Sequence, residues 1–366
     1  MSLEELQDLM ARADDLAGHP QGVEVAERAV QLSDRQDDPE SSFRARLLLT
    51  RCASFAGFPD VAFVAFSWCL AQCDRDPERF PDDRVLWEYK WILESLHEFP
   101  QFSLQQTERA FEDAKQRYRA NGYSPRPLLL IQASALATRG ETDRASSMLR
   151  EALASPRDEK ADCVACEPHL IANVHLDAGE WTAALDALEP VLTHQYGCTH
   201  EPARAYALAL HPLCELGRMD EAKRLHKLGC PRSLDTAGIV ESVANHIQFL
   251  LRTENHARAV EVFDASWKHT LGESPLVRLH FGFRAALLFE DLQGTYGPAA
   301  ATVRIPRGHA LFGRATGDDA AALASWFRED CESLADALDA RNETPRLRKW
   351  MSETASAVSQ RLPLEL

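Results

Sequence analysis

Apolar residues recur along this chain at helical spacing, in pairs of segments that are separated by a short turn. One pair consists of an apolar segment over 128–137, a turn at Gly140, and a segment over 145–152 whose small and apolar residues share one helical face. The same arrangement returns around Gly179 and again around Gly217. The pattern predicts helical hairpins, each made of a first helix, a tight turn and a second helix.

The turn between the paired segments recurs about every 39 residues, with successive spacings of 39, 43, 40, 39, 38 and 38. Glycine suits most of these turns because a tight helix–helix connection needs a residue in the left-handed conformation. A two-helix period of this size indicates stacked hairpins that bury their apolar faces against their neighbours. We therefore predict an all-α solenoid of six or seven hairpins, with turns at Gly18, Gly57, Pro100, Gly140, Gly179, Gly217 and Asn255.

The hairpins resemble the tetratricopeptide repeat (TPR) family. Gly179, Trp181 and Ala184 match the family's glycine, aromatic residue and alanine, and Ala172 is the small residue one turn back in the first helix. The family's usual period is about 34 residues, so each hairpin here is a few residues longer. The resemblance implies a right-handed superhelix whose first helices line a concave groove. The cysteine spacing also resembles an uncharacterised bacterial TPR group with a Cys-x2-Cys…Cys insertion, which implies no activity.

The repeat rhythm ends near residue 270. We predict TPR-like repeats over 1–270 and a C-terminal helical cap over 271–366. Within the cap, glycines and prolines predict an irregular loop over about 292–317, with a short β-like run at 302–305. Asp318 is the predicted N-cap of the long amphipathic helix that follows.

The TPR resemblance also implies which residues face the groove. Several of them are basic, although the chain as a whole carries a net charge of -16. A basic groove suits a protein or peptide segment with acidic residues or a free C-terminal carboxylate. The alternative is the mixed polar surface of an ordinary solenoid. The predicted groove residues are Arg44, Arg51, Trp87, Lys90, His169, Asn173, Arg204, His211 and Gln248.

Cysteines and histidines gather between residues 163 and 230. Cys163 and Cys166 precede the turn at Gly179 by 16 and 13 residues, and Cys198 and His200 precede the next turn by 19 and 17. Both pairs therefore lie on the same edge of adjacent hairpins. Three thiolates and one imidazole are typical of a structural Zn²⁺ site. Ordinary half-buried thiols and a redox-active Cys163–Cys166 pair are the alternatives. The reserve ligands are His169, His175 and Cys230.

Composition narrows the function. With 40 basic and 56 acidic residues, the surface repels nucleic-acid phosphates and anionic membranes. The chain contains no uninterrupted apolar run of membrane-spanning length and no secretory leader pattern, so we expect a cytoplasmic protein. It also lacks a His-Glu-x-x-His motif, a phosphate-binding glycine loop and a Gly-x-Ser-x-Gly elbow. We predict a non-enzymatic, regulatory adaptor that holds a partner segment, with self-association through its edges as an option. The alternative is a zinc-dependent or thiol-redox enzyme that uses the cysteine cluster.

Overall fold

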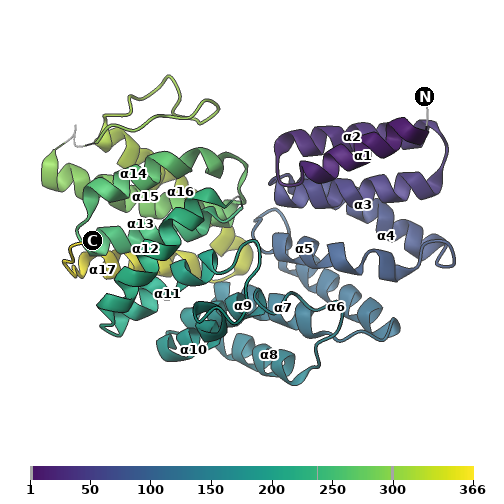
Figure 1. Cartoon of the computed structure of the whole chain (residues 1–366), viewed down its shortest axis with the longest axis horizontal. Helices are drawn as coiled ribbons and strands as arrows, with labels where there is room; N and C mark the ends of the chain where they lie inside the picture. The colour runs from purple at the N-terminus through teal and green to yellow at the C-terminus, as the bar shows by residue number, and fades with distance from the viewer. Residues whose placement is uncertain (1–2, 237, 298–300) are drawn as a thin grey trace. The chain divides into compact units, whose positions relative to one another are not determined.

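A computed structural model gives the fold and describes residues 3–236, 238–297 and 301–366. Within these ranges the chain forms seventeen α-helices, two 3-10 helices and no strand (Figure 1). The prediction of an all-α protein is confirmed. The chain divides into two compact units, which are described separately. The first comprises the residues up to His97, Phe102–Ile131 and Glu151–Ala161, and the second comprises Glu98–Gln101, Gln132–Arg150 and the residues from Asp162 onward.

In the first unit each α-helix from α1 to α5 packs against the next one along the chain, and α3 also contacts both α1 and α5. Local sequence starts α3 where it does, because Asp38 accepts a hydrogen bond from the backbone of Glu40 at 3.1 Å and Pro39 is the first helical residue. Its helices are α1 (Leu3–Asp15), α2 (Pro20–Arg35), α3 (Pro39–Phe55), α4 (Pro59–Arg75), η1 (Asp82–Arg84), α5 (Leu86–Leu96) and α6 (Leu104–Ala120).

Two helices, α7 (Arg126–Thr138) and α8 (Thr142–Ala154), have residues in both units. The second unit continues with α9 (Glu167–Asp177), α10 (Trp181–Leu192), α11 (Ala203–Glu215), α12 (Met219–Asp235), α13 (Val240–Arg252), α14 (His256–Ser266), η2 (Trp267–Gly272), α15 (Pro275–Tyr296), α16 (Ala320–Asn342) and α17 (Arg346–Ser359). The helices α9, α11, α13 and α15 contact one another in that order, and α10, α12 and α14 pack beside them. This order of contacts is typical of stacked hairpins. A right-handed solenoid through the whole chain stays a prediction.

The turn residues take the conformation that their type predicts. Gly140, Gly179 and Gly217 have φ angles of 80°, 74° and 70°, which fall in the left-handed region. At the last predicted turn the left-handed residue is Glu254, with φ of 60°, and not Asn255. The Asn255 side chain instead joins two segments, since its Nδ2 donates to the carbonyl oxygens of Thr253 and Leu364, both at 2.9 Å.

The C-terminal helices belong to the same compact unit as α9–α14, and the predicted division at residue 270 stays a prediction. The helix α15 packs along α16, and α17 contacts α13. The last residues run beside the end of α13, where the Leu362 N–H donates to the carbonyl oxygen of Arg252 at 2.7 Å. Leu362, Leu364 and Leu366 then pack against the apolar cluster of α10–α12.

Three details of the predicted cap are corrected. The helix α15 continues to Tyr296, beyond the expected start of the loop at 292. The β-like run at 302–305 is not a strand: Val303 makes one backbone hydrogen bond, to Gly317, and Arg304 is held by the Asp264 carboxylate. The N-cap of α16 is Asp319, which accepts a hydrogen bond from Ala322, and not Asp318. No helix in the described ranges is both long and apolar enough to span a membrane.

Candidate functional site

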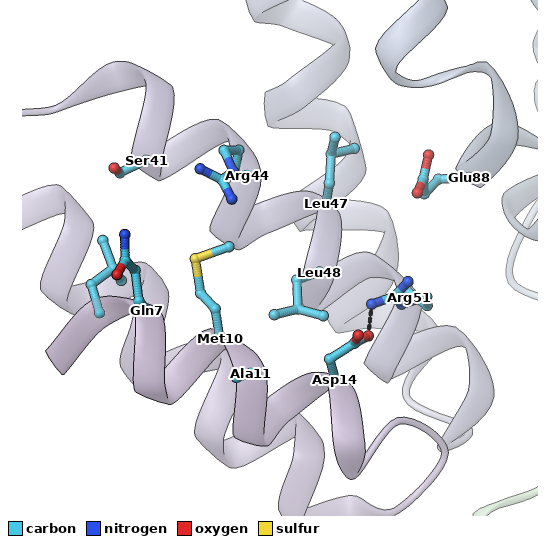
Figure 2. Close-up of a pocket in the computed structure, with 11 residues that line it drawn as sticks. Gln7, Met10, Ala11, Asp14, Ser41, Arg44, Leu47, Leu48, Arg51 and Glu88 are labelled. Carbon is cyan, nitrogen blue, oxygen red and sulfur yellow. Dashed lines mark ion pairs between the residues drawn. The ribbon is translucent and has the colours of Figure 1, made fainter. Parts of the chain in front are cut away.

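The first unit contains a pocket of about 520 Å³ between α1 and α3, with α5 at one side (Figure 2). Each of the two main helices contributes residues at spacings of three and four, which place side chains on one face. The lining residues are Leu6, Gln7, Met10, Ala11 and Asp14 from α1, Ser41, Arg44, Leu47, Leu48 and Arg51 from α3, and Glu88 from α5. Two predicted groove residues, Arg44 and Arg51, therefore line a pocket in the folded chain.

The pocket combines an apolar floor with charged walls. Leu6 and Leu48 are buried residues of the pocket lining. The flexible side chain of Met10 lies beside Leu48 (Figure 2). Arg51 forms a salt bridge with Asp14, and its Nε atom is buried without a hydrogen-bond partner in the described part of the chain.

Arg44 is exposed at the pocket and forms no salt bridge within the described residues. The acid one turn before it in α3, Glu40, is bound by Arg84 through two hydrogen bonds of 2.7 and 2.9 Å. The carboxylate of Glu40 is therefore already paired with another arginine, although the Arg44 charge also helps to lower its pKa.

Trp87 and Lys90 lie outside this pocket. Trp87 remains 38% exposed, whereas only 1% of Lys90 is exposed. The Lys90 ammonium lies 3.5 Å from the centroid of the Trp87 ring and donates to the carbonyl oxygen of Lys160 at 2.9 Å. The prediction that Lys90 faces an open groove is therefore corrected, because its ammonium is buried beneath the Trp87 ring.

The other predicted groove residues lie in the second unit, on α9, α11 and α13. Arg204 donates to Glu201 at 3.0 Å, so its guanidinium already has an acidic partner. Burial and the nearby charge of Arg204 lower the pKa of His169 to about 3, and the Nδ1 atom of His169 has no hydrogen-bond partner within the described ranges. Asn173 is half-buried near them on α9.

His211 and Gln248 are engaged by neighbouring side chains. The His211 ring meets Trp181 edge-on at 5.0 Å, and burial lowers its pKa to about 4. Gln248 is 7% exposed, and its Oε1 accepts a hydrogen bond from Arg284 at 2.9 Å. Gln248 is therefore part of a buried polar contact, which corrects its assignment to an open groove.

The three predicted cysteine ligands meet in the second unit. Cys163 and Cys166 lie in the connection between α8 and α9, and Cys198 lies between α10 and α11. The Sγ atoms of Cys163 and Cys166 are 2.9 Å apart, and those of Cys166 and Cys198 are 3.6 Å apart. All three cysteines are free, and their sulfurs lie within 4.8 Å of one another. Three sulfurs at such distances can hold a metal ion.

The thiols of this cluster differ in acidity. Burial raises the pKa of Cys166, and its hydrogen bond with Cys163 adds to that effect. Burial by itself would raise the pKa of Cys198. Hydrogen bonds from the backbone N–H groups of Glu201 and His200 and from the neighbouring thiols together outweigh this effect, so the pKa of Cys198 is lowered overall. Cys198 therefore loses its proton more easily than Cys166, whose sulfur lies 3.6 Å away.

The predicted fourth ligand and the reserve ligands lie elsewhere. His200 is outside the group of three sulfurs. His175 is bound to Glu180 at 2.6 Å. Cys230 lies in the interior with His226 and His246, in a second cluster whose ligand atoms are within 4.8 Å of one another. Sequence reasoning missed this second cluster, although the His-x3-Cys spacing on one helix was a signal for it.

No protein-family model matches the chain, and no curated protein or solved structure matches it significantly. The resemblance to TPR proteins therefore stays an interpretation of the sequence.

Proposed function

We propose that this protein is a non-enzymatic scaffold that binds a short segment of a partner protein in the pocket between α1 and α3. The single observation that supports this proposal is the exposed guanidinium of Arg44 above an apolar floor that includes Leu6 and Leu48. In a chain with a net charge of -16, an unpaired cation beside buried leucines is complementary to an acidic segment with an apolar side chain.

The chemistry of the lining defines the segment further. The apolar floor buries one aliphatic or aromatic anchor, and Met10 adapts to its shape because the methionine side chain is unbranched and flexible. A carboxylate next to that anchor accepts charge-assisted hydrogen bonds from Arg44. Arg51 contributes less because Asp14 already occupies its guanidinium. Glu88 on the α5 side disfavours a second carboxylate there.

Peptides selected against the purified chain from a random library test this function. We expect the selected peptides to share an apolar residue flanked by Asp or Glu. In fluorescence anisotropy, Arg44→Glu should weaken their binding about tenfold or more, since a hydrogen bond to a charged group contributes about 1.5–3 kcal/mol. Arg28→Glu is the matched control, because Arg28 is an exposed arginine of the same unit outside the pocket.

Replacing Asp or Glu by Asn or Gln in the selected peptides should weaken binding to the wild-type chain but not to Arg44→Glu. Unchanged affinity of every selected peptide for Arg44→Glu would contradict a role of this pocket in partner binding.

We further propose that Cys163, Cys166 and Cys198 bind a structural Zn²⁺ ion. Thiolate sulfur lies about 2.3 Å from zinc, so two sulfurs of a tetrahedral site are about 3.8 Å apart. The 3.6 Å between Cys166 and Cys198 is close to this value, and the 2.9 Å between Cys163 and Cys166 would have to widen. The sequence offers His200 as the fourth ligand. The ion would join two successive inter-helix connections of the second unit.

One observation favours a second function, thiol–disulfide exchange. The lowered pKa of Cys198 makes it a nucleophile beside two further thiols. Its thiolate would attack one sulfur of a substrate disulfide and release the other sulfur as a thiolate, and Cys166 would then resolve the mixed disulfide. Turnover of a disulfide peptide with a thiol reductant, abolished by Cys198→Ser, would support this function. If the metal-free protein shows no such turnover, only the structural role of the cysteine cluster would remain.

A further inference from the structure

The interior of the second unit holds a cluster of two histidines and one cysteine. His226 and Cys230 are four residues apart on one face of α12, and His246 projects from α13. Their exposed fractions are 5%, 2% and 0%. One nitrogen or sulfur atom from each lies within 4.8 Å of the others. A thiolate is a soft ligand and imidazole suits copper and zinc, so these three side chains can hold a metal ion.

Close packing of three helices holds the cluster in place. Gly229, between the two ligands on α12, lies so close to its neighbours that an added Cβ would be 2.7 Å from the Cβ of Tyr206 and 3.1 Å from Cε1 and Nε2 of His246. The His226 ring packs against Phe249, with their centroids 5.0 Å apart. The His246 ring is therefore pressed against the backbone of α12, where its rotation is restricted.

The hydrogen bonds of the cluster leave one ring nitrogen unused. The Nδ1 atoms of His226 and His246 are 3.1 Å apart, so one imidazole donates to the other. The remaining nitrogen of His246, Nε2, is buried and has no hydrogen-bond partner in the part of the chain that the structure describes. A buried polar atom without a partner is uncommon in a folded protein and points to a missing ligand.

The charge of the three ligands favours a monovalent metal ion over a divalent one. One thiolate with two neutral imidazoles balances a monovalent ion and leaves a divalent ion with one uncompensated charge in an apolar interior. The neighbouring charge is also positive, since Arg258 acts electrostatically on both His226 and Cys230. No further Cys, His, Asp or Glu of the described residues joins the group, so the protein supplies three ligands.

We propose that His226, Cys230 and His246 bind one Cu⁺ ion in a buried three-coordinate site. Binding replaces the proton of the Cys230 thiol, which passes to solvent, and the complex of ion and thiolate is neutral. The ion gives the imidazole lone pairs a partner and links α12 to α13. This site is separate from the cluster of Cys163, Cys166 and Cys198, and it does not depend on partner binding by the first unit.

The test uses the full chain with Cys163→Ser, Cys166→Ser and Cys198→Ser, so that the exposed thiols cannot bind copper. This background protein is loaded with Cu⁺ without oxygen, in competition with a chromogenic Cu⁺ chelator, and then passed through a desalting column. We expect one copper per chain. Adding Cys230→Ser to the background should reduce the bound copper to near zero. Adding Cys214→Ser, which replaces a buried cysteine of α11 outside the cluster, should leave it at one.

X-ray absorption at the copper edge tests the same site without replacing a buried ligand, in case Cys230→Ser does not fold. We expect one sulfur and two nitrogen neighbours around copper in the background protein. A spectrum without a sulfur neighbour, or equal copper binding with and without Cys230 in folded proteins, would overturn the proposal. Retention of Zn²⁺ that Cu⁺ fails to displace would overturn the choice of metal.

Discussion

Arg44 and Arg51 lie two turns apart on the same face of α3 and line one pocket, but only Arg51 is paired with an acid of the protein, Asp14 (Figure 2). The difference comes from their neighbours, because α1 places a carboxylate opposite Arg51 while Glu40 beside Arg44 is bound by Arg84. The two arginines have the same side chain, yet within the described residues Arg44 forms no salt bridge. Under the proposed function, this asymmetry places the acidic group of a partner at Arg44.

Asp14→Asn should increase the affinity of the pocket for an acidic peptide. The substitution removes the carboxylate that pairs with Arg51 and leaves both guanidinium groups for the ligand. Because exposed ion pairs contribute about 0.2–1 kcal/mol, we expect binding about two- to fivefold tighter at low salt, with the gain shrinking as salt rises. Fluorescence anisotropy at several salt concentrations measures it. Asp8→Asn, an exposed position on α1 outside the pocket lining, is the control and should show less gain.

Cys198→Ser should abolish zinc retention. Elemental analysis of protein purified without chelator should fall from one zinc per chain to none, and Cys163 and Cys166 should become reactive toward thiol reagents. Loss of a structural ion from a small site usually costs several kcal/mol of folding free energy. Cys214→Ser should retain the zinc, since this buried cysteine is not part of the cluster. Wild-type protein with well below one zinc per chain and freely reactive thiols would contradict a metal site here.

His169→Gln should reduce the loss of stability in mild acid. Burial and Arg204 lower the pKa of His169 to about 3 in the folded chain, against about 6.5 in the unfolded chain. Below pH 6.5 the unfolded state therefore takes up a proton that the folded state does not, so stability is complete above pH 6.5 and falls as the pH decreases toward 3. For one such histidine the loss between pH 6.5 and 5 is about 2 kcal/mol.

Urea unfolding at pH 6.5 and pH 5 measures this effect. The wild-type protein should lose more stability over the interval than His169→Gln. His194→Gln replaces an exposed histidine of the same unit and should leave the difference between the two pH values as in the wild type. An equal loss in His169→Gln and the wild type would show that His169 does not couple folding to protonation.

Gly229→Ala and Gly294→Ala should have opposite effects on stability. Both glycines lie within helices, where alanine is intrinsically favoured by about 1 kcal/mol. At Gly229 the new Cβ would meet Tyr206 at 2.7 Å, and overpacking of this kind costs about 1–3 kcal/mol. At Gly294 the new Cβ would meet no atom of the described residues within 4 Å beyond its own stretch of helix, so the helical gain should remain. Thermal unfolding should give a lower midpoint for Gly229→Ala and a higher one for Gly294→Ala.

The helices and most of their turns could be predicted from the sequence because they depend on local physics. Apolar spacing of three and four residues determines a helical face wherever it occurs, and glycines such as Gly179 and Gly217 take a left-handed conformation at little cost. The periodicity also predicted that Cys166 and Cys198 lie close together, because equivalent positions of adjacent hairpins come close in space. These features can be predicted from the local sequence around each residue and from the length of the repeat.

Tertiary packing decided the rest. The same helical register that predicted a groove position for Lys90 gave no information about the Trp87 ring and the Lys160 carbonyl oxygen that enclose its ammonium. Cys230 and His246 lie close together because α12 approaches α13 closely. Gly229 allows this approach, since a side chain at its position would collide with Tyr206 and His246. A sequence determines which side chains share a helical face. Which of them are enclosed, paired or left free depends on residues that only the folded chain brings together.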